Sequence, residues 1–529
     1  MVVTTPNPIH DLSEPTASWS TINLSEAVPG PVTPLGWSVW SPAGEVGGRL
    51  PFYAMGVIPK SLTAPPPRPE DRILNVFYGR VALRVDFMCE MGDLVPGTSG
   101  EALGRQVFGF VPETFVSRPS KRRYPAIAVK FPPTFLRVPA LIRTARAETG
   151  PWWTAEVART PSLDLAGARA QLQAAIDRFT RNLTLQATAI TCGIQVVYDQ
   201  LSLLAGKAGV DPGALMSGHG SHEETAVIDD LWEVSRDRLT LDGFVARHGY
   251  HGPFEGELSG VSWRENQAPL MKLVDGYRSM ADDAAPAAVE AARAVARREA
   301  ESQLLAALPR TGRLQARLVL KLAGRYLPLR GVGKVAFLQS LDVARAAARR
   351  IGALLAADGV LVEPDDVFYL TAPEILGPPP ADARGLVAER REIREGYRKL
   401  RLPTTWTGNP TYEMIDEGET GVGALTGVGV SAGVVEGPAR VVTDPALAEM
   451  EPGDVLVAHT TDPSWASLMF MAKALVVDIG GQLSHAAVVA RELGIPCVMN
   501  TVDGTRVLRD GDRLRVDGAA GTVEILERR

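Results

Sequence analysis

The sequence has little cysteine, and its three cysteines, Cys89, Cys192 and Cys497, lie far apart. This spacing excludes a disulfide framework and a zinc site built on paired cysteines, and it favours a reducing, cytoplasmic setting. The N-terminus lacks the basic head and apolar core of a signal peptide, and no apolar run is long enough to span a bilayer. We therefore expect a cytoplasmic protein with no membrane partner.

An excess of charge of one sign is also missing. The 55 lysines and arginines against 61 aspartates and glutamates give a net charge of −6, and such a chain does not attract nucleic acid by its overall field. Hydrophobic residues make up 45% and charged residues 22% of the 529 positions, as in folded globular proteins. The length alone suggests roughly three or four domains.

The pattern of apolar residues changes along the chain. Residues 1–150 are rich in proline and glycine and predict mixed short strands and loops, among them apolar runs at 73–77 and 81–87. Apolar residues at helical spacing predict long helices within 162–205 and 287–357. One stripe, expected to face the core, consists of Phe337, Leu338, Leu341, Ala344, Ala348, Ile351 and Leu355, with Arg345, Arg349 and Arg350 outside it.

A connector is predicted at 371–412, where prolines surround a charged helix-like stretch, and a domain boundary is predicted near residue 415. Glycine-broken short strands follow, interrupted by a helix from His485 to Leu493. These strands are expected at 427–430, 439–442, 454–458, 474–477, 497–499, 513–516 and 522–525. The predicted fold class is multidomain α+β, in which a large, mostly helical domain precedes a small α/β domain.

The segment GGQLSHAAVVARELGIPCVMN, residues 480–500, carries the most chemistry. A strand enters a double glycine, and Ser484 and His485 then open a helix that ends at Gly494 and Pro496. A neutral imidazole is a competent nucleophile toward phosphorus, and a helix N-terminus stabilises the anion that would form there. A buried histidine that only satisfies a local hydrogen bond fits the spacing equally well. Ser484 is expected to cap the helix or to bond the imidazole.

Residues 424–527 contain GVGVSAGVVEGPARV, DVLVAHTTDPSWASL and GGQLSHAAVVARELGIP. This part resembles the mobile phosphohistidine domain of phosphoenolpyruvate-utilising enzymes. The resemblance implies a swivelling domain at 424–529 that carries a phosphoryl group on His485. The loop around that histidine is expected to comprise Gly480, Gly481, Ser484, Thr461 and Asp462. Thr461 and Asp462 either orient the ring or form an ordinary turn.

The upstream sequence contains NLSEAVPGPVTPLGWS, RHGYHGPFEGELSGVSWRE and GRYLPLRG. These segments are similar to the substrate-binding domain of rifampicin phosphotransferase. The resemblance implies a substrate-binding domain at 1–415, with a mixed part at 1–150, a helical part at 151–370 and a linker at 371–423. Its substrate would be a bulky small molecule with a hydroxyl acceptor, and the aromatic Trp37 is among the residues expected to line its pocket.

The same resemblance suggests roles for several charged residues. Glu26 is expected either to accept the proton of the acceptor hydroxyl or to cap or pair within its loop. Arg325 is expected either to bind the transferred phosphoryl group or to be a surface arginine or a member of an ion pair. Pro328 predicts a helix break beside Arg325. Leu329 stands where the related enzymes have a lysine, so Arg330 or Lys334 is expected to supply that charge. Further residues expected at the pocket, or alternatively in structural networks, are Arg247, His248, Glu255 and Glu257.

No nucleotide-grasp segment is recognisable before residue 20 and no phosphoenolpyruvate barrel after residue 527. We therefore expect no cofactor bound directly by this chain, and ATP with Mg²⁺ supplied through a separate ATP-grasp subunit. Two His-x-x-His pairs, at 219 and 222 and at 248 and 251, have a spacing compatible with zinc, but no cysteine lies near them and no metal site is predicted.

Three functions remain open from the sequence. The first is a phosphotransferase component that passes phosphoryl from His485 to a small molecule. The second is a dehydratase or condensing ligase of natural-product biosynthesis that activates its substrate by transient phosphorylation, as the prodigiosin-forming ligases related to the family suggest. The third is a ligand-binding or regulatory module without catalysis. The first two require a phosphorylated His485, and only the first requires a stable phosphorylated product.

Overall fold

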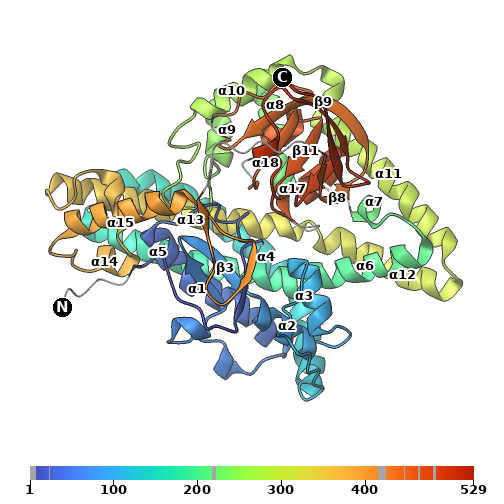
Figure 1. The fold of residues 1–529 in the computed structure, drawn as a ribbon, viewed down its shortest axis with the longest axis horizontal. Helices are drawn as coiled ribbons and strands as arrows, with labels where there is room; N and C mark the ends of the chain where they lie inside the picture. The colour runs from blue at the N-terminus through green and yellow to red at the C-terminus, as the bar shows by residue number, and fades with distance from the viewer. Residues whose placement is uncertain are drawn as a thin grey trace. The chain divides into compact units, whose positions relative to one another are not determined.

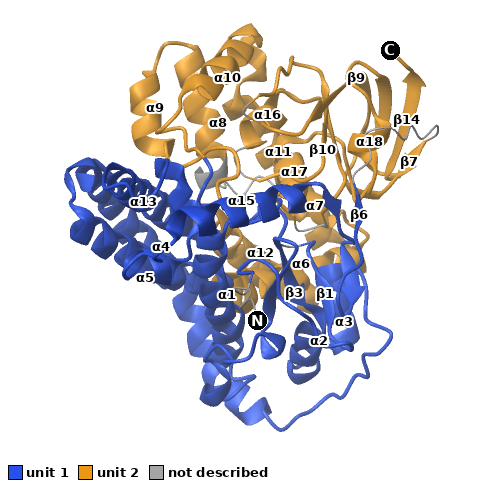
Figure 2. Cartoon of the chain, turned by 60° about the vertical axis from the view of Figure 1, so that its left-hand side comes forward, with its two compact units in different colours: residues 1–188, 256–260, 333–416 blue, residues 189–255, 261–332, 417–529 orange. Residues whose placement is uncertain are grey.

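The structure is a computed structural model, and it describes residues 7–22, 24–216, 222–414, 424–445, 447–462, 465–480 and 484–529, without the side chains of 222–224. The chain divides into two compact units (Figure 2). Unit 1 comprises residues 1–188, 256–260 and 333–416, and unit 2 comprises residues 189–255, 261–332 and 417–529. No described helix is both long and apolar enough to cross a membrane.

Unit 1 is built on long helices and a small sheet. The long helices are α1 (Pro34–Met55), α4 (Tyr124–Arg159), α5 (Leu165–Ala189) and α13 (Leu329–Ala357). The shorter ones are α2 (Val85–Leu94), α3 (Gly100–Phe108), α14 (Ala372–Leu376) and α15 (Ala383–Arg398). The sheet has the order β2-β3-β1-β5, formed by Leu74–Phe77, Arg80–Arg84, Ser18–Ser20 and Thr405–Thr407. A separate pair joins β4 (Leu400–Arg401) to β6 (Glu413–Met414).

The expectation of only short strands and loops over residues 1–150 is wrong in part: β1, β2 and β3 lie there, but so do helices α1, α2, α3 and most of α4. The helices were missed because they contain prolines, which normally indicate a break: α1 contains Pro42 and Pro51, and α4 also continues through several prolines. Thr33 caps α1 by accepting a hydrogen bond from the amide of Gly36. Packing between long helices outweighs such local breakers. Of the apolar run at 81–87, only the first half is strand, since α2 begins at Val85.

The predicted connector at 371–412 forms regular structure that packs into unit 1. Strand β5 pairs antiparallel with β1, placing Trp406 opposite Trp19. Both indole rings are buried, and Phe77 lies against each of them. This stretch therefore supplies an edge strand of the unit 1 sheet, although β5 lies almost 400 residues after its partner β1 in the sequence.

Unit 2 begins with seven helices. They are α6 (Gln195–Ala208), α7 (Pro212–Met216), α8 (His222–Ser235), α9 (Leu241–His248), α10 (Ala268–Ser279), α11 (Pro286–Ala307) and α12 (Arg310–Tyr326). A π-helical turn at Ile190–Ile194 leads from α5 into α6. The helix break predicted at Pro328 is present, since α12 ends at Tyr326 and α13 begins at Leu329.

Residues 424–529, the C-terminal domain, form an eight-stranded sheet (red in Figure 1) with the order β7-β14-β13-β9-β10-β11-β12-β8. The strands are β7 (Leu425–Thr426), β8 (Val428–Ser431), β9 (Val434–Val442), β10 (Val455–Ala458), β11 (Ala474–Val477), β12 (Cys497–Met499), β13 (Arg513–Asp517) and β14 (Thr522–Glu527). Strands β9 to β12 are parallel to one another, and the remaining pairs are antiparallel. Three helices accompany the sheet: α16 (Ala466–Met471), α17 (His485–Leu493) and α18 (Gly504–Val507).

The C-terminal domain shares a hydrophobic core with helices α8 and α10 of the same unit. Trp232 and Tyr277 pack against Phe470, with ring centroids 6.3 and 5.3 Å away. The sequence prediction groups residues 1–415 apart from 424–529, whereas the compact units place 189–255 and 261–332 together with the C-terminal domain. This shared core accounts for the grouping. The fold class is multidomain α+β, as expected.

Candidate functional site

His485 is the first residue of α17, directly after the segment that follows β11. Ser484 caps the helix, its Oγ accepting a hydrogen bond of 3.2 Å from the amide of Ala487. Gly494 ends the helix at a positive φ of 67°, a backbone conformation that glycine adopts without strain. The cap and the stop thus fix where α17 begins and place the imidazole at its N-terminus.

The imidazole of His485 lies at the carboxyl edge of the parallel strands. Thr461 follows β10 and His485 follows β11, and these two strands are parallel neighbours. The Thr461 Oγ1 lies 3.5 Å from the His485 Nδ1, at the outer limit of a hydrogen bond. Thr461, Asp462 and His485 are all buried, and His485 is only 4% exposed. Of the predicted loop residues, Gly480 is described and buried, and Gly481 lies outside the described residues.

This arrangement suits a phosphorylated imidazole. The first amides of α17 have no carbonyl partner within the helix, and the helix dipole is positive at that end. A ring nitrogen that forms an N–P bond there would have its anionic oxygens stabilised by these groups. If the Thr461 hydroxyl occupies Nδ1, Nε2 is the ring nitrogen left to form such a bond.

Asp478, which belongs to none of the sequence motifs above, organises the loops at the same edge. It is 1% exposed and accepts hydrogen bonds from the Thr501 hydroxyl at 3.0 Å and the Thr505 amide at 3.2 Å. The Oδ2 of Asp478 also lies 3.2 Å from the Nδ1 of His459, whose side chain is 56% exposed. An aspartate at the end of a buried apolar strand was the available signal, since loops at that edge need a shared acceptor.

The predicted phosphoryl-binding arginine, Arg325, is exposed in the last turn of α12. The adjacent Tyr326 is fully buried, and burial raises the pKa of its phenol. Arg330 and Lys334 lie half-buried near the start of α13. The positions agree with a cationic segment around Pro328, and the catalytic roles stay predictions.

The charged cluster predicted from RHGYHGPFEGE divides into pairs. The Nε2 of His248 lies 2.8 Å from the Oδ2 of Asp230, and Arg247 reaches the same oxygen at 3.1 Å. The hydrogen bond from His248 and then that from Arg247 lower the pKa of Asp230, whereas burial lowers the pKa of His248. His251 pairs with Glu255 at 2.6 Å, both side chains buried. These pairs are compatible with the structural alternative, and the roles of Arg247, His248 and Glu255 at a pocket stay predictions.

Three predicted pocket residues lie in unit 1. Glu257 is buried and accepts hydrogen bonds from the hydroxyl of Thr33 at 2.6 Å and from its amide at 3.2 Å, so it braces the start of α1. Trp37 is buried in the first turns of α1, and Glu26 is half-buried in the turns between β1 and α1. The roles of all three at a substrate pocket stay predictions.

Only one of the two His-x-x-His pairs, at 248 and 251, lies wholly within the described residues. His219 and the side chain of His222 lie outside the described residues. His248 and His251 are each held by a carboxylate, as described above. Among the residues that the structure describes, no group of three or more histidines, cysteines or carboxylates is arranged to hold one ion.

The contacts between the C-terminal domain and the helices of unit 2 are mostly apolar. The fully buried Tyr277 donates a hydrogen bond of 3.1 Å to the carbonyl of Ser467, and burial raises its pKa well above the usual value. Lys272 lies 3.8 Å from Glu449 in an exposed ion pair. Local sequence patterns do not predict these contacts, because each joins residues more than 170 positions apart.

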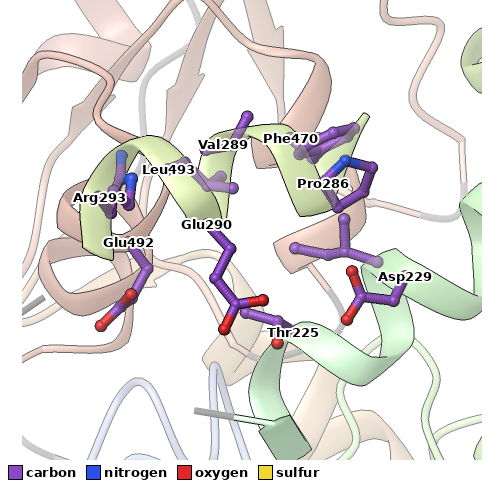
Figure 3. A pocket seen from close by; sticks show the side chains of 10 residues that line it. Thr225, Asp229, Pro286, Val289, Glu290, Arg293, Phe470, Glu492 and Leu493 are labelled. Carbon is purple, nitrogen blue, oxygen red and sulfur yellow. The ribbon is translucent and has the colours of Figure 1, made fainter. Parts of the chain in front are cut away.

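A small cavity opens where α8 and α11 meet α16 and α17 (Figure 3). Arg293 of α11 lies at its edge, against the C-terminal end of α17: a Cβ atom on Gly494 would be 2.2 Å from the guanidinium. Burial lowers the pKa of Arg293 to about 10, although nearby Glu492 opposes the shift. A cation at this end of α17 complements the negative end of the helix dipole.

Two parts of the chain match known families. Residues 450–521, which include His485, match the family "PEP-utilising enzyme, mobile domain". Residues 198–330, which include Arg325, match the family "Rifampicin phosphotransferase fourth domain". Both matches were anticipated by the resemblance, and the second lies almost wholly in the helices of unit 2.

Individual relatives point the same way. The rifampicin phosphotransferase of Streptomyces sviceus is 33% identical over 317 residues, which cover 58% of this chain and 36% of that protein. An uncharacterized protein of Mycobacterium tuberculosis strain H37Rv is 34% identical over 284 residues, covering 53% of this chain and 30% of the relative. An uncharacterized phosphotransferase of Bacillus subtilis strain 168 is 37% identical over 193 residues, covering 34% and 23%.

This chain spans between 23% and 36% of the length of these three relatives. The similarity is therefore to one part of larger proteins. Residues 450–521 are thus similar to the mobile domain of PEP-utilising enzymes, and they lie in the same compact unit as most of a segment similar to the fourth domain of rifampicin phosphotransferase.

Proposed function

We propose that this chain is a phosphotransferase component that carries a phosphoryl group on His485 to a hydroxyl of a bulky small molecule. The observation that carries the proposal is the position of His485 at the capped N-terminus of α17, inside the segment that matches the mobile domain. The relatives named rifampicin phosphotransferase support a small-molecule acceptor. A separate ATP-grasp subunit would provide the donor, binding ATP with Mg²⁺.

The reaction has two balanced steps. An imidazole nitrogen of His485 attacks phosphorus in ATP, an N–P bond forms, and the P–O bond to the nucleotide leaving group breaks. The acceptor oxygen then attacks the same phosphorus and the N–P bond breaks, while the hydroxyl proton passes to a base, for which we propose Glu26. Arg325 would neutralise charge on the phosphoryl oxygens, because positioning and charge neutralisation dominate such transfers.

Both steps require His485 to become accessible. At 4% exposure the ring cannot reach a nucleotide on another chain. The C-terminal domain is held to its neighbouring helices mainly by apolar contacts, which lack the directional demands of a buried polar network. We propose that this domain separates from α8, α10 and α11 to expose His485 and docks again after transfer.

The test uses the full chain, the donor subunit and ATP labelled in the transferred phosphate. We expect a protein adduct that is labile in acid and stable in base, as phosphohistidine is, and that is lost in His485→Ala. His459→Ala is the matched control: its side chain is exposed at the same sheet edge, and the label should remain. Equal labelling of wild type and His485→Ala would contradict the proposal.

The second step is tested by following the transfer of the label from His485 to an acceptor, which we call discharge. Arg325→Ala should keep the label on His485 but slow its transfer to an acceptor by about 100-fold, the loss typical of removing one charge-stabilising group. Arg398→Ala, which removes an exposed arginine of α15, is the control. Unchanged discharge in Arg325→Ala would remove this residue from the site without affecting the role of His485.

A further inference from the structure

Helix α12 carries an unbroken run of positive charge. Residues 302–341 contain no aspartate or glutamate. The cations of α12 are Arg310, Arg313, Arg317, Lys321 and Arg325. The last four are spaced by four residues, so they follow one another along a single side of the helix.

This side of the helix faces solvent. All five cations are exposed, whereas Ala316, Val319, Ala323 and Tyr326 are buried on the opposite side, where α12 packs on α6 (Figure 1). Within the described part of the chain, no carboxylate forms an ion pair with any of the five. Arg313 donates to the carbonyl of Leu308, which brings no negative charge.

Such a row does not stabilise the helix itself. Like charges four residues apart repel one another, and a carboxylate among them would have relieved the repulsion. Arg325 accounts for one of the charges through its proposed contact with phosphoryl. Arg313, Arg317 and Lys321 lie on the preceding turns and have no role in that transfer.

Two large apolar side chains accompany the cations. Leu314 is 73% and Leu318 59% exposed, and their spacing of four places them side by side next to the charged row. An apolar centre with a charged rim is the usual composition of a protein docking surface. A small anion would need a concave site, and a membrane-surface helix would need a wider apolar face than two leucines offer. The net charge of −6 argues against nucleic acid.

We propose that the exposed face of α12, formed by Arg313, Leu314, Arg317, Leu318 and Lys321, docks a protein partner that presents carboxylates around an apolar contact. The partner's identity rests on the proposed function: it is the ATP-dependent chain that phosphorylates His485. Charge complementarity supports this occupant, because unpaired cations on a convex helix accelerate encounter with an acidic surface and fix its orientation.

The docking surface is tested first without a donor, by fluorescence anisotropy of a fluorescein-labelled peptide of alternating glutamate and leucine titrated with the full chain. We expect binding that weakens as salt rises and falls at least tenfold in the double variant Arg317→Glu/Lys321→Glu. The matched control is Arg298→Glu/Lys399→Glu, which reverses two exposed cations outside α12. Equal binding by the three proteins, or no binding by the wild type, would overturn the docking surface.

A flotation assay with vesicles that contain phosphatidylserine tests whether this face binds a membrane instead of a protein. If the wild type floats with these vesicles, the α12 variant does not, and neither protein binds the peptide, the proposal of a protein partner is overturned.

The donor assay decides the partner's identity: the initial rate of His485 labelling should fall at least tenfold in the α12 variant and stay within twofold in the control. An unchanged labelling rate in a variant that has lost peptide binding would overturn the donor as partner. Absence of label in the wild type would instead contradict the proposed function, and the peptide result would still decide the docking surface.

Discussion

The contacts inside unit 1 differ in kind from the contacts inside unit 2. In unit 1, α4 and α13 are joined by buried polar bonds: the Trp153 Nε1 donates to Asp342 at 2.8 Å, and Arg345 pairs with the same carboxylate at 3.2 Å. In unit 2, the C-terminal domain meets α8 and α10 mainly through apolar side chains. Directional bonds specify one arrangement, whereas apolar contacts hold surfaces together without fixing a partner for each atom. The difference fits a rigid unit 1 and a separable C-terminal domain.

The largest expected effect comes from breaking the polar core of unit 1. Asp342→Ala leaves the guanidinium of Arg345 buried without its carboxylate and should lower the free energy of unfolding by about 3–5 kcal/mol. Urea denaturation followed by circular dichroism measures it. Asp365→Ala is the control, because it removes an exposed partner of Arg349 on the same helix and should cost about 0.5 kcal/mol or less. Equal losses would show that the buried network does not hold unit 1 together.

The apolar contacts of unit 2 come next. Phe470→Ala removes the ring between Trp232 and Tyr277, at a cost of about 3 kcal/mol. We expect faster hydrogen exchange in α8, α10 and α16, with no change in the helices of unit 1. Leu447→Ala, at a residue 72% exposed, is the control. A rise in exchange throughout unit 1 would contradict a separable C-terminal domain.

Tyr277→Phe probes one polar contact in this apolar setting and should weaken docking by about 1 kcal/mol, because one hydrogen bond to Ser467 is lost. Burial raises the pKa of Tyr277, so the folded state keeps its phenol proton after the unfolded state has lost it. Its contribution to stability is therefore complete below about pH 10 and is lost as the pH rises above that value. Denaturation between pH 8 and 11 should show a steeper loss for wild type than for Tyr277→Phe. Tyr412→Phe, with 52% exposure, should behave like wild type.

The smallest effect is expected at His248, in the helices of unit 2. Burial lowers its pKa, so at acidic pH the unfolded state takes up a proton that the folded state does not. Stability should therefore be complete above about pH 6.5 and fall by about 1 kcal/mol or less as the pH drops below it. His248→Gln should remove this dependence between pH 5 and 7. The same pH dependence in the variant would assign it to another group.

Most strands of the C-terminal domain and its helix α17 follow from local sequence, whereas β7, α16, α18 and the first half of β9 were not predicted. Strands at 474–477 and 497–499 and the helix at 485–493 were predicted with the bounds that the structure shows. Each is a short apolar segment flanked by polar residues, proline, glycines or caps, so its bounds can be read from neighbouring residues. In unit 1 the same approach failed over residues 1–150, because prolines inside α1 and α4 signal breaks that helix packing overrides.

The position of His485 was also readable from the sequence, since Ser484 and Gly494 mark the two ends of α17. Its contact with Thr461 required the parallel pairing of β10 with β11. Arg345 shows the limit most clearly. It lies outside the apolar stripe of α13 and was expected away from the core, yet it is 1% exposed because Asp342 pairs with it inside the unit.

Sequence by itself determined the fold class, most strands of the C-terminal domain and the histidine at the start of α17, because caps, glycines and short apolar runs act over a few residues. Only the tertiary structure decided that β5 completes the sheet of unit 1 and that Tyr277 meets Ser467. The same holds for the solvent-facing side of α12, whose cations have no ion-pair partner among the described residues. These features depend on contacts between residues that are far apart in sequence, and local sequence patterns do not predict such contacts.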